Sequence, residues 1–418
     1  MKEKGNLEGS TKDCLKYSNK NSGITLIVLV VTIVVLIVLA TVSINAVLGQ
    51  NGIIGKAKQA KESYEKSVKA EDTAMQKLLN EMAQYNAGGS TGDIDPTKNW
   101  DLDKVNKVTS EDNIVVPVPK GYTTSTVEGE KSVSTGFVIK EGSNGGATSG
   151  INEFVWVPVS NISDIYDEAN NAGQLWDFSG TTSTKKTYPT TKNDGYREPD
   201  VVTGARSSSD SANGSQYDAV STNLQQAGMS STATASDFKT QLQTEFNEMI
   251  KSVKTYGGFY IGRYETGNLS QTKAVVQKNN TDIGDKAWYT MYKVCKTIKA
   301  NENVETSMLW GCQWDATLRW MQTSSNSEVA NFPTNSEGKG NYSGSKKATG
   351  SNSDYAVNNI YDMAGNVFEW TMEAFYTNSR AKRGGSCSGT ASEAPASLRA
   401  GIYPTDSYYG CRSTLYIK

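Results

Sequence analysis

The chain has 418 residues, of which 37% are hydrophobic, and it carries 42 basic against 44 acidic side chains. This length and apolar content allow two or three domains with a buried core, and the balanced charge argues against nucleic-acid binding along a basic face. The chain has no histidine, which excludes Ser-His hydrolases and His-ligated zinc or iron centres.

The first predicted element is an apolar helix over residues 24–47. No charge lies between Lys20 and Lys56, and a helix over this run measures about 36 Å, enough to cross a hydrocarbon layer of about 30 Å. Apolar residues at helical spacing to about residue 85 predict that the helix continues as a stalk. On composition alone a signal-anchor helix is favoured, because the run is too long for a secretory signal and no A-x-A-like site follows it.

The start of this helix resembles the prepilin signal of type IV pilins and pseudopilins. A Lys-rich prefix ends at Gly23, and the apolar run opens at Ile24. The resemblance implies that a prepilin peptidase cleaves after Gly23 and removes a leader of residues 1–23, with Cys14. The family usually carries Glu at the fifth mature position, where this chain has Val28. This departure favours a minor or tip subunit, or a membrane-held relative, over a major pilus subunit.

Residues 86–98 are rich in Gly, Ser, Asp and Pro and predict a linker, so a second domain is expected over residues 99–418. Short β-branched and aromatic runs predict strands at 113–119, 136–140, 153–159 and 258–265. Helical periodicity predicts helices at 236–253, about 286–300 and about 313–322. Residues from about 179 to 236 are mostly small and polar and predict a mobile or partly disordered surface insertion. The fold class is α+β.

Five blocks of this domain resemble, in the same order, the formylglycine-generating enzyme or sulfatase-modifying-factor family. The blocks are GGFYIGRYETG, WDATLRWM, NNIYDMAGNVFEW, KRGGSCSG and YYGCRSTLYI. The likeness runs from about Glu153 to the C-terminus, apart from the polar insertion. It implies a variant of the C-type lectin fold.

The turn at residues 360–370 is a candidate calcium site. On its residues alone, a solvated turn is the favoured interpretation. In the family just named the matching turn binds calcium, and the resemblance assigns the ion to the side chains of Asp362 and Glu369 and the carbonyls of Gly365 and Val367. Such a set is suited to Ca²⁺, which takes six to eight hard oxygen ligands in irregular loops.

Catalysis by this family's chemistry is not expected. Its oxidase members use two cysteines a few residues apart after the Arg-Gly-Gly-Ser strand, whereas no cysteine follows Cys387 until Cys411. The four cysteines outside the leader permit two disulfides or four buried thiols. The resemblance places Cys387 near Cys411, which leaves Cys295 to pair with Cys312.

The C-terminal stretch combines Tyr with Ser, Thr and acidic residues, a composition typical of recognition surfaces, although a sheet edge with ordinary turns would also show it. It further resembles the variable proteins of diversity-generating retroelements. That resemblance implies a scaffold of Arg383, Gly384, Gly385, Leu398 and Arg412. It assigns ligand contact to Ser388, Thr390, Ser392, Glu393, Tyr403, Asp406, Ser407, Tyr408 and Tyr409.

The leading hypothesis is therefore a single-pass protein of the cell membrane and surface, or of a pilus tip, whose extracellular lectin-type domain binds a protein or glycan ligand. Partners would include the membrane, the prepilin peptidase and other pilins. One alternative is a structural minor pilin or pseudopilin whose globular part only packs. The other is an enzyme of the formylglycine-generating type.

Overall fold

The computed structural model describes residues 30–39, 56, 61, 100–187, 198–204, 218 and 220–418. The chain divides between residues 89 and 90 into two units. In the first unit residues 30–39 are helical, and their large hydrophobic side chains are 47% to 60% exposed. Within the described stretches, no helix has both the length and the apolar character needed to cross a membrane. The predicted leader, Gly23, Ile24, most of the predicted 24–85 helix and the linker lie outside the described residues.

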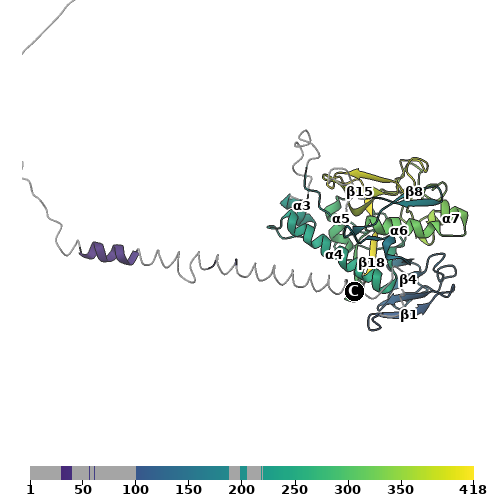
Figure 1. The fold of residues 1–418 in the computed structure, drawn as a ribbon, viewed down its shortest axis with the longest axis horizontal. Coiled ribbons are helices and arrows are strands. Elements are labelled where there is room, and N and C mark those ends of the chain that lie inside the picture. Colours follow the sequence, from purple (N-terminus) through teal and green to yellow (C-terminus); the bar gives the residue numbers. More distant parts are fainter. Residues whose placement is uncertain are drawn as a thin grey trace, which may run out of the picture. The chain divides into compact units, whose positions relative to one another are not determined.

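The second unit, which we call the head, mixes helices and strands, with strands in the majority among its described elements (Figure 1). Its main sheet is antiparallel throughout. In sheet order its strands are β11 (Val304–Met308), β18 (Ser413–Ile417), β10 (Gly258–Gly262), β5 (Glu153–Pro158), β4 (Val138–Glu141) and β3 (Tyr122–Thr124). The C-terminal strand β18 therefore lies inside the sheet, between β10 and β11, and every residue of β10 and β18 is buried.

A second sheet carries the C-terminal blocks of the sequence. Its order is β16 (Arg399–Ile402), β15 (Ser379–Arg383), β14 (Glu369–Tyr376) and β17 (Gly410–Cys411). β17 runs parallel to β14, whereas the other pairs are antiparallel. The chain passes directly from β17 through Arg412 into β18, so one residue connects the two sheets.

Helix α4 (Ala235–Tyr256) covers the main sheet, where it contacts β10 and β18. It begins at a capping box in which Thr234 and Asp237 satisfy each other's backbone amides, two residues before the predicted start. It ends at Gly257, whose φ of 78° suits a residue without a Cβ. Its predicted apolar face is buried: Phe238, Leu242, Phe246, Met249, Ile250 and Val253.

Two more helices match predicted positions. Helix α6 (Gly311–Gln322) contacts both β5 and β14 and so links the two sheets. Helix α5 (Trp288–Cys295) is shorter than predicted. Side chains satisfy its last carbonyls: Thr297 Oγ1 donates to the carbonyl of Val294 at 2.6 Å, and Thr306 Oγ1 to that of Cys295 at 2.8 Å.

The remaining described elements are short. The helices are α3 (Ser221–Gln226), α7 (Ser327–Asn331), η1 (Ile162–Asp164) and η4 (Ser353–Tyr355). The hairpins pair β1 (Val105–Thr109) with β2 (Val115–Pro119), β6 (Tyr166–Asp167) with β7 (Ala172–Gly173), β8 (Trp176–Ser179) with β9 (Thr182–Lys185), and β12 (Ala356–Val357) with β13 (Ile360–Tyr361).

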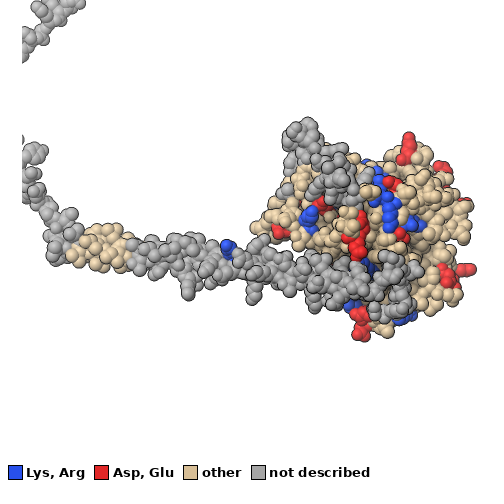
Figure 2. Space-filling view, viewed as in Figure 1, with Lys and Arg blue, Asp and Glu red and all other residues tan. Residues whose placement is uncertain are grey.

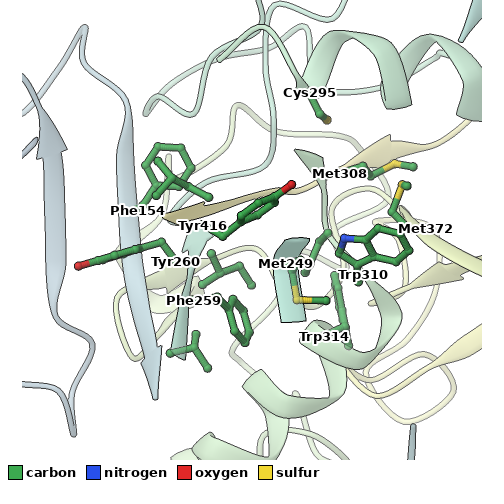
Figure 3. Packing of buried hydrophobic residues seen from close by; sticks show 14 of the residues in the cluster. Phe154, Met249, Phe259, Tyr260, Cys295, Met308, Trp310, Trp314, Met372 and Tyr416 are labelled. Carbon is green, nitrogen blue, oxygen red and sulfur yellow. The ribbon is translucent and has the colours of Figure 1, made fainter. Parts of the chain in front are cut away.

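Aromatic and sulfur-containing side chains fill the core. Figure 3 shows Met249, Trp310, Trp314 and Phe259 gathered in the interior, and all four are at most 1% exposed. Burying each such side chain contributes about 1.5–3 kcal/mol relative to leaving it exposed. Tyr260 points outward from this core, and its hydroxyl donates to the carbonyl of Pro117 at 3.0 Å, which ties β2 to the main sheet.

The structure differs from the predicted insertion at 179–236 where it describes that segment. Glu198, Val202 and Asp218 are completely buried. Asp218 accepts from Arg380 at 2.6 Å, and Arg380 also donates to the carbonyl of Asp200 at 2.8 Å. Buried ion pairs and hydrogen bonds hold this segment together with a few core contacts of Val201, Leu224 and Ala227, so its mostly polar composition did not reveal its packing. Residues 188–197, 205–217 and 219 lie outside the described residues.

Candidate functional site

The first loop of the candidate site, residues 384–398, joins β15 to β16, and one buried and one half-buried side chain fix its backbone. Trp314 Nε1 donates to the carbonyl of Ala396 at 3.0 Å, and Tyr342 Oη donates to the carbonyl of Ala394 at 2.7 Å. The side chains of both alanines are buried. Four predicted contact residues on this loop are exposed: Ser388, Thr390, Ser392 and Glu393. The loop thus presents polar side chains from a backbone held by other parts of the head.

The second loop, residues 403–409, joins β16 to β17. Its carbonyl at Pro404 accepts from the backbone amide of Trp288, at the start of α5, at 2.9 Å. Ser407 is exposed, and Tyr408 is 80% exposed, the largest value among the head's exposed large hydrophobic residues in the described stretches. Tyr403 and Asp406 are half-buried. Four of the five predicted contact residues on this loop are thus open to solvent at least in part.

Tyr409, unlike the exposed Tyr408, is buried, so its predicted role in ligand contact needs correction. It is 9% exposed, and its ring meets Trp370 edge-on with centroids 4.9 Å apart. The ammonium of Lys382 lies 4.6 Å from the ring centroid of Tyr409 and 4.1 Å from that of Phe368, a cation–π arrangement. Tyr409 therefore belongs to the support of the second loop, because its neighbours cover the ring.

Burial and the neighbouring charge act in opposite directions on the pKa values of Lys382 and Asp406. Burial lowers the pKa of Lys382 while Asp406 raises it, and burial raises the pKa of Asp406 while Lys382 lowers it. On the face of the head that Figure 2 displays, acidic and basic side chains occur in small interspersed groups. This pattern does not favour a ligand of one strong charge.

Two short segments connect the loops. The amide of Gly344 donates to the carbonyl of Cys387 in the first loop at 2.8 Å. Lys346 pairs with Asp285 at 2.7 Å. Gly284 lies close to both Lys346 and the second loop. A Cβ atom placed on Gly284 would be 3.6 Å from Lys346 Nζ and 3.6 Å from the carbonyl oxygen of Tyr409. Residues 284–285 and 344–346 therefore bridge the two loops.

The predicted scaffold arginines are completely buried and paired. Arg412 makes two hydrogen bonds to Glu369, Nη2–Oε1 at 2.6 Å and Nε–Oε2 at 3.0 Å. It also donates to the carbonyls of Gly262 and Tyr361 at 3.0 and 2.8 Å. Arg383 donates to Asp315 of α6. These contacts attach the small sheet to the main sheet and to α6.

Gly384 and Gly385 begin the first loop with φ of 81° and 80°. A Cβ on Gly384 would lie 2.6 Å from the carbonyl oxygen of Met363, so both conformation and space require glycine there. Leu398, by contrast, is only half-buried. Four of the five predicted scaffold residues are therefore buried, and Leu398 is not.

The two side chains among the predicted calcium ligands already accept hydrogen bonds from protein groups. Both Glu369 oxygens accept from Arg412, and Asp362 Oδ2 accepts from the amide of Gly350 at 2.7 Å. The other two predicted ligands are the backbone carbonyls of Gly365 and Val367, which are both buried residues. Among the described residues, no group of three or more Asp, Glu or Cys is placed to hold a metal ion. Calcium binding at this turn stays a prediction, and an ion bound to Glu369 would compete with Arg412 for its carboxylate.

A third buried carboxyl, Glu265, joins this turn and was not predicted. Its Oε2 accepts from Asn366 at 2.6 Å, while Oε1 has no hydrogen-bond partner among the described residues. Burial raises the pKa of Glu265 well above its usual range, and the nearby Asp362 and Glu369 raise it further. Glu369 accepts the hydrogen bonds from Arg412, and burial together with the mutual repulsion of the three carboxyls favours their protonated forms. No local pattern indicates this cluster, because Glu265 lies 101 positions before Asn366 and the tertiary fold brings them together.

A second buried acidic group, also unpredicted, lies beneath the first loop. Glu198 accepts from the amides of Gly311 and Cys312 at the start of α6, at 2.6 and 2.8 Å, which suits the positive end of a helix. Burial raises the pKa of Glu198 to about 8, and the neighbouring Glu373 adds to the increase. Glu373 in turn lies 3.4 Å from Arg399 of β16. This group therefore connects α6 to the strand between the two loops.

No protein-family model matches the chain, and no curated protein matches it. Among solved structures, the chain is similar to Treponema denticola variable protein 1, with 14% sequence identity and a TM-score of 0.24. The match covers 64% of this chain and 97% of that one. These values are too low to define a shared fold or function. The geometry of the two loops does not depend on this similarity.

The cysteines do not meet as predicted. Cys411 lies beside Cys295, with the sulfur atoms 3.5 Å apart, whereas Cys387 bonds through its backbone to Asn366 and Gly344. Cys312 lies at the start of α6 beside Glu198. All four described cysteines are free thiols here. The pairing differs because Cys295, at the end of α5, meets Cys411 of β17, whereas Cys387 lies on the loop between β15 and β16.

Proposed function

We propose that this chain is a surface-displayed ligand-binding protein whose ligand contacts the exposed side chains of the first and second loops. The proposal rests on one observation about the first loop: its backbone is held by hydrogen bonds, whereas its polar side chains are exposed. The buried Trp314 of α6 and the half-buried Tyr342 hold the backbone, while the side chains at 388, 390, 392 and 393 are exposed to solvent. Side chains at these positions can change without loss of the backbone anchors, which is what a diversified binding face requires.

Tyr408 supports the same proposal. An aromatic ring that is 80% exposed gains nothing from folding. Tyrosine offers a large contact area with only two rotatable side-chain bonds, so binding orders it at a small entropic cost. We place the centre of the contact at Tyr408 and the half-buried Tyr403, with Asp406 and Ser407 between them providing hydrogen bonds.

We propose further that the N-terminal helix attaches the chain to the cell surface. Its described residues expose an unbroken run of large apolar side chains, from Ile33 to Leu39, which suits contact with lipid or with another apolar helix. Cleavage after Gly23 by a prepilin peptidase and contact with other pilins belong to this proposal. N-terminal sequencing of the mature protein tests it, with Ile24 as the expected first residue and an intact Met1 as the contrary result.

The proposed activity is binding without catalysis. Cys387 is half-buried on the first loop, and the other described cysteines are completely buried. A surface chemistry that needs two accessible thiols therefore finds only Cys387 accessible among the described cysteines. Incubation with a cysteine-containing sulfatase peptide should yield no formylglycine, and production of formylglycine would contradict this part of the proposal.

A glycan and protein array with the full chain in detergent tests ligand binding. We expect at least one ligand, and we expect Tyr403→Ala with Tyr408→Ala to weaken its binding by more than tenfold. Leu102→Ala is the matched control, since Leu102 is 56% exposed and precedes β1, at the opposite end of the head from β15 (Figure 1). Both proteins should keep the wild-type melting temperature. Undiminished binding by the folded double variant would contradict the proposal.

A further inference from the structure

Cys295 and Cys411 are neighbours in the interior of the head. Their sulfur atoms lie 3.5 Å apart, both residues are completely buried, and 116 positions separate them in the sequence. Cys295 is the last residue of α5, and its side chain points from the end of that helix into the core (Figure 3). Cys411 is the last residue of β17. The contact is therefore created by the tertiary fold and by no local turn.

Regular structure holds both residues in place. The carbonyl of Cys295 accepts from Thr306 Oγ1 at 2.8 Å, and the carbonyl of Cys411 accepts from the amide of Thr266 at 2.9 Å. Cys411 also pairs with Trp370 across the parallel β17–β14 ladder. A disulfide bond requires sulfur atoms about 2.05 Å apart, so closing the contact needs a combined displacement of about 1.5 Å, which side-chain rotation can supply.

We propose that Cys295 and Cys411 are a disulfide-forming pair, whose oxidation fixes the end of the second loop to α5. The start of that loop is already attached to α5, because Pro404 accepts from Trp288. The disulfide would attach the other end two residues after Tyr409. Residues 404–411 would then be held at both ends of one helix. This inference concerns the thiols alone and does not depend on whether the loops bind a ligand.

The oxidant is a small or protein disulfide that undergoes thiol–disulfide exchange. One cysteine thiolate attacks a sulfur of that disulfide, forms a mixed disulfide and releases one thiol. The second thiolate attacks the mixed disulfide, forms the Cys295–Cys411 bond and releases the second thiol. The two cysteines together lose two protons and two electrons, and the oxidant becomes two thiols. Because both sulfur atoms are buried, the exchange takes place as the head folds.

Cys312 and Cys387 provide matched controls within the same chain. Cys312 is as buried as Cys295 but lies against Glu198, whose carboxylate accepts from its amide at 2.8 Å. Cys387 is half-buried, and its sulfur lies 3.9 Å from Ser388 Oγ. If burial or accessibility alone governed oxidation, one of these two cysteines would react as readily as the proposed pair.

Peptide mapping of the unmutated protein tests the pairing directly. The full chain is refolded in detergent with oxidised glutathione, its free thiols are alkylated, and the digest is analysed without reduction. We expect a cross-linked peptide that contains Cys295 and Cys411, that is two hydrogens lighter than the sum of its parts, and that disappears on reduction. Cys312 and Cys387 should be alkylated. Recovery of Cys295 and Cys411 as alkylated thiols, or of Cys411 joined to Cys387, would overturn the proposal.

A melting experiment provides a second readout. A cross-link that closes a loop of this length stabilises by restricting the unfolded chain, so reduction should lower the melting temperature of the oxidised protein by about 5–15 °C. Cys387→Ser should keep this shift. The double variant Cys295→Ala with Cys411→Ala should lose it, and a shift that persists in the double variant would count against the pair.

Discussion

The buried scaffold and the two loops of the head use the same kinds of polar side chain in opposite ways. In the scaffold, Arg412 and Glu369 are completely enclosed and satisfy each other with two hydrogen bonds. In the first loop, Thr390 and Glu393 are exposed and bond only across their own turn, at 3.0 Å. A polar group costs free energy when it is buried without a partner and little when it faces water. The head should therefore tolerate change in the loops and resist it directly beneath them.

Removing the scaffold arginine should have the largest effect. Arg412→Met would leave Glu369 buried without its guanidinium, beside Glu265 and Asp362. Breaking a buried ion pair from one side costs about 3–5 kcal/mol, and urea unfolding should show a loss of stability of this size. Lys131→Met, which removes only an exposed pair with Glu111, serves as the control and should change little. A scaffold variant as stable as the control would mean that the buried pair does not hold the two sheets together.

The next effect is a dependence of stability on pH. Burial raises the pKa of Glu198 to about 8 in the folded head. A carboxyl with a raised pKa binds its proton more tightly in the folded state. Its contribution to stability is complete below about pH 4.5 and is lost as the pH rises towards 8. We expect a loss on the order of 4 kcal/mol across this window.

Glu198→Gln should flatten that part of the profile, because the amide does not titrate. Glu302→Gln is the control, since the side chain of Glu302 is 87% exposed. Urea midpoints at pH 5 and pH 8.5 for the three proteins provide the measurement. A profile that keeps its full slope in Glu198→Gln would assign the dependence to another buried acid, such as Glu265.

Tyr409 and Tyr408 sharpen the comparison within two consecutive residues. Tyr409→Ala removes a ring that packs on Trp370 and Phe368, and we expect it to lower stability by about 2–3 kcal/mol. Tyr408→Ala removes an exposed ring and should leave stability within about 0.5 kcal/mol of wild type. Thermal melts of the two variants distinguish these cases, and equal losses would show that both rings support the loop.

The sequence predicted repeating patterns well and individual contacts poorly. The apolar face of residues 236–253 was visible because helical spacing repeats several times over that length. Which of Tyr408 and Tyr409 faces inward was not visible, because successive residues of an extended segment point to opposite sides and composition does not fix the phase.

The partners of buried polar groups were equally hidden from the sequence. Glu198 lies more than a hundred positions from the amides it accepts from, and Cys295 lies 116 positions from Cys411. Such contacts depend on how helices and sheets are brought together, which no local pattern records. The exposure of Ser388, Thr390, Ser392 and Glu393 agrees with the predicted loop because short polar residues among small ones are typical of solvent-facing turns.

The smallest expected effect per replaced side chain is the most direct test of the contrast between scaffold and loops. Simultaneous replacement of Ser388, Thr390, Ser392 and Glu393 by alanine removes the exposed hydroxyls and carboxylate of the first loop. The backbone anchors from Trp314 and Tyr342 remain, so stability should change by less than about 1 kcal/mol in total. Ala394→Asp, at a buried position of the same loop, is the matched control and should destabilise far more, because it buries a charge. If the fourfold variant unfolds as readily as Ala394→Asp, the exposed side chains shape the loop themselves, and a binding face that varies at these positions could not keep one backbone.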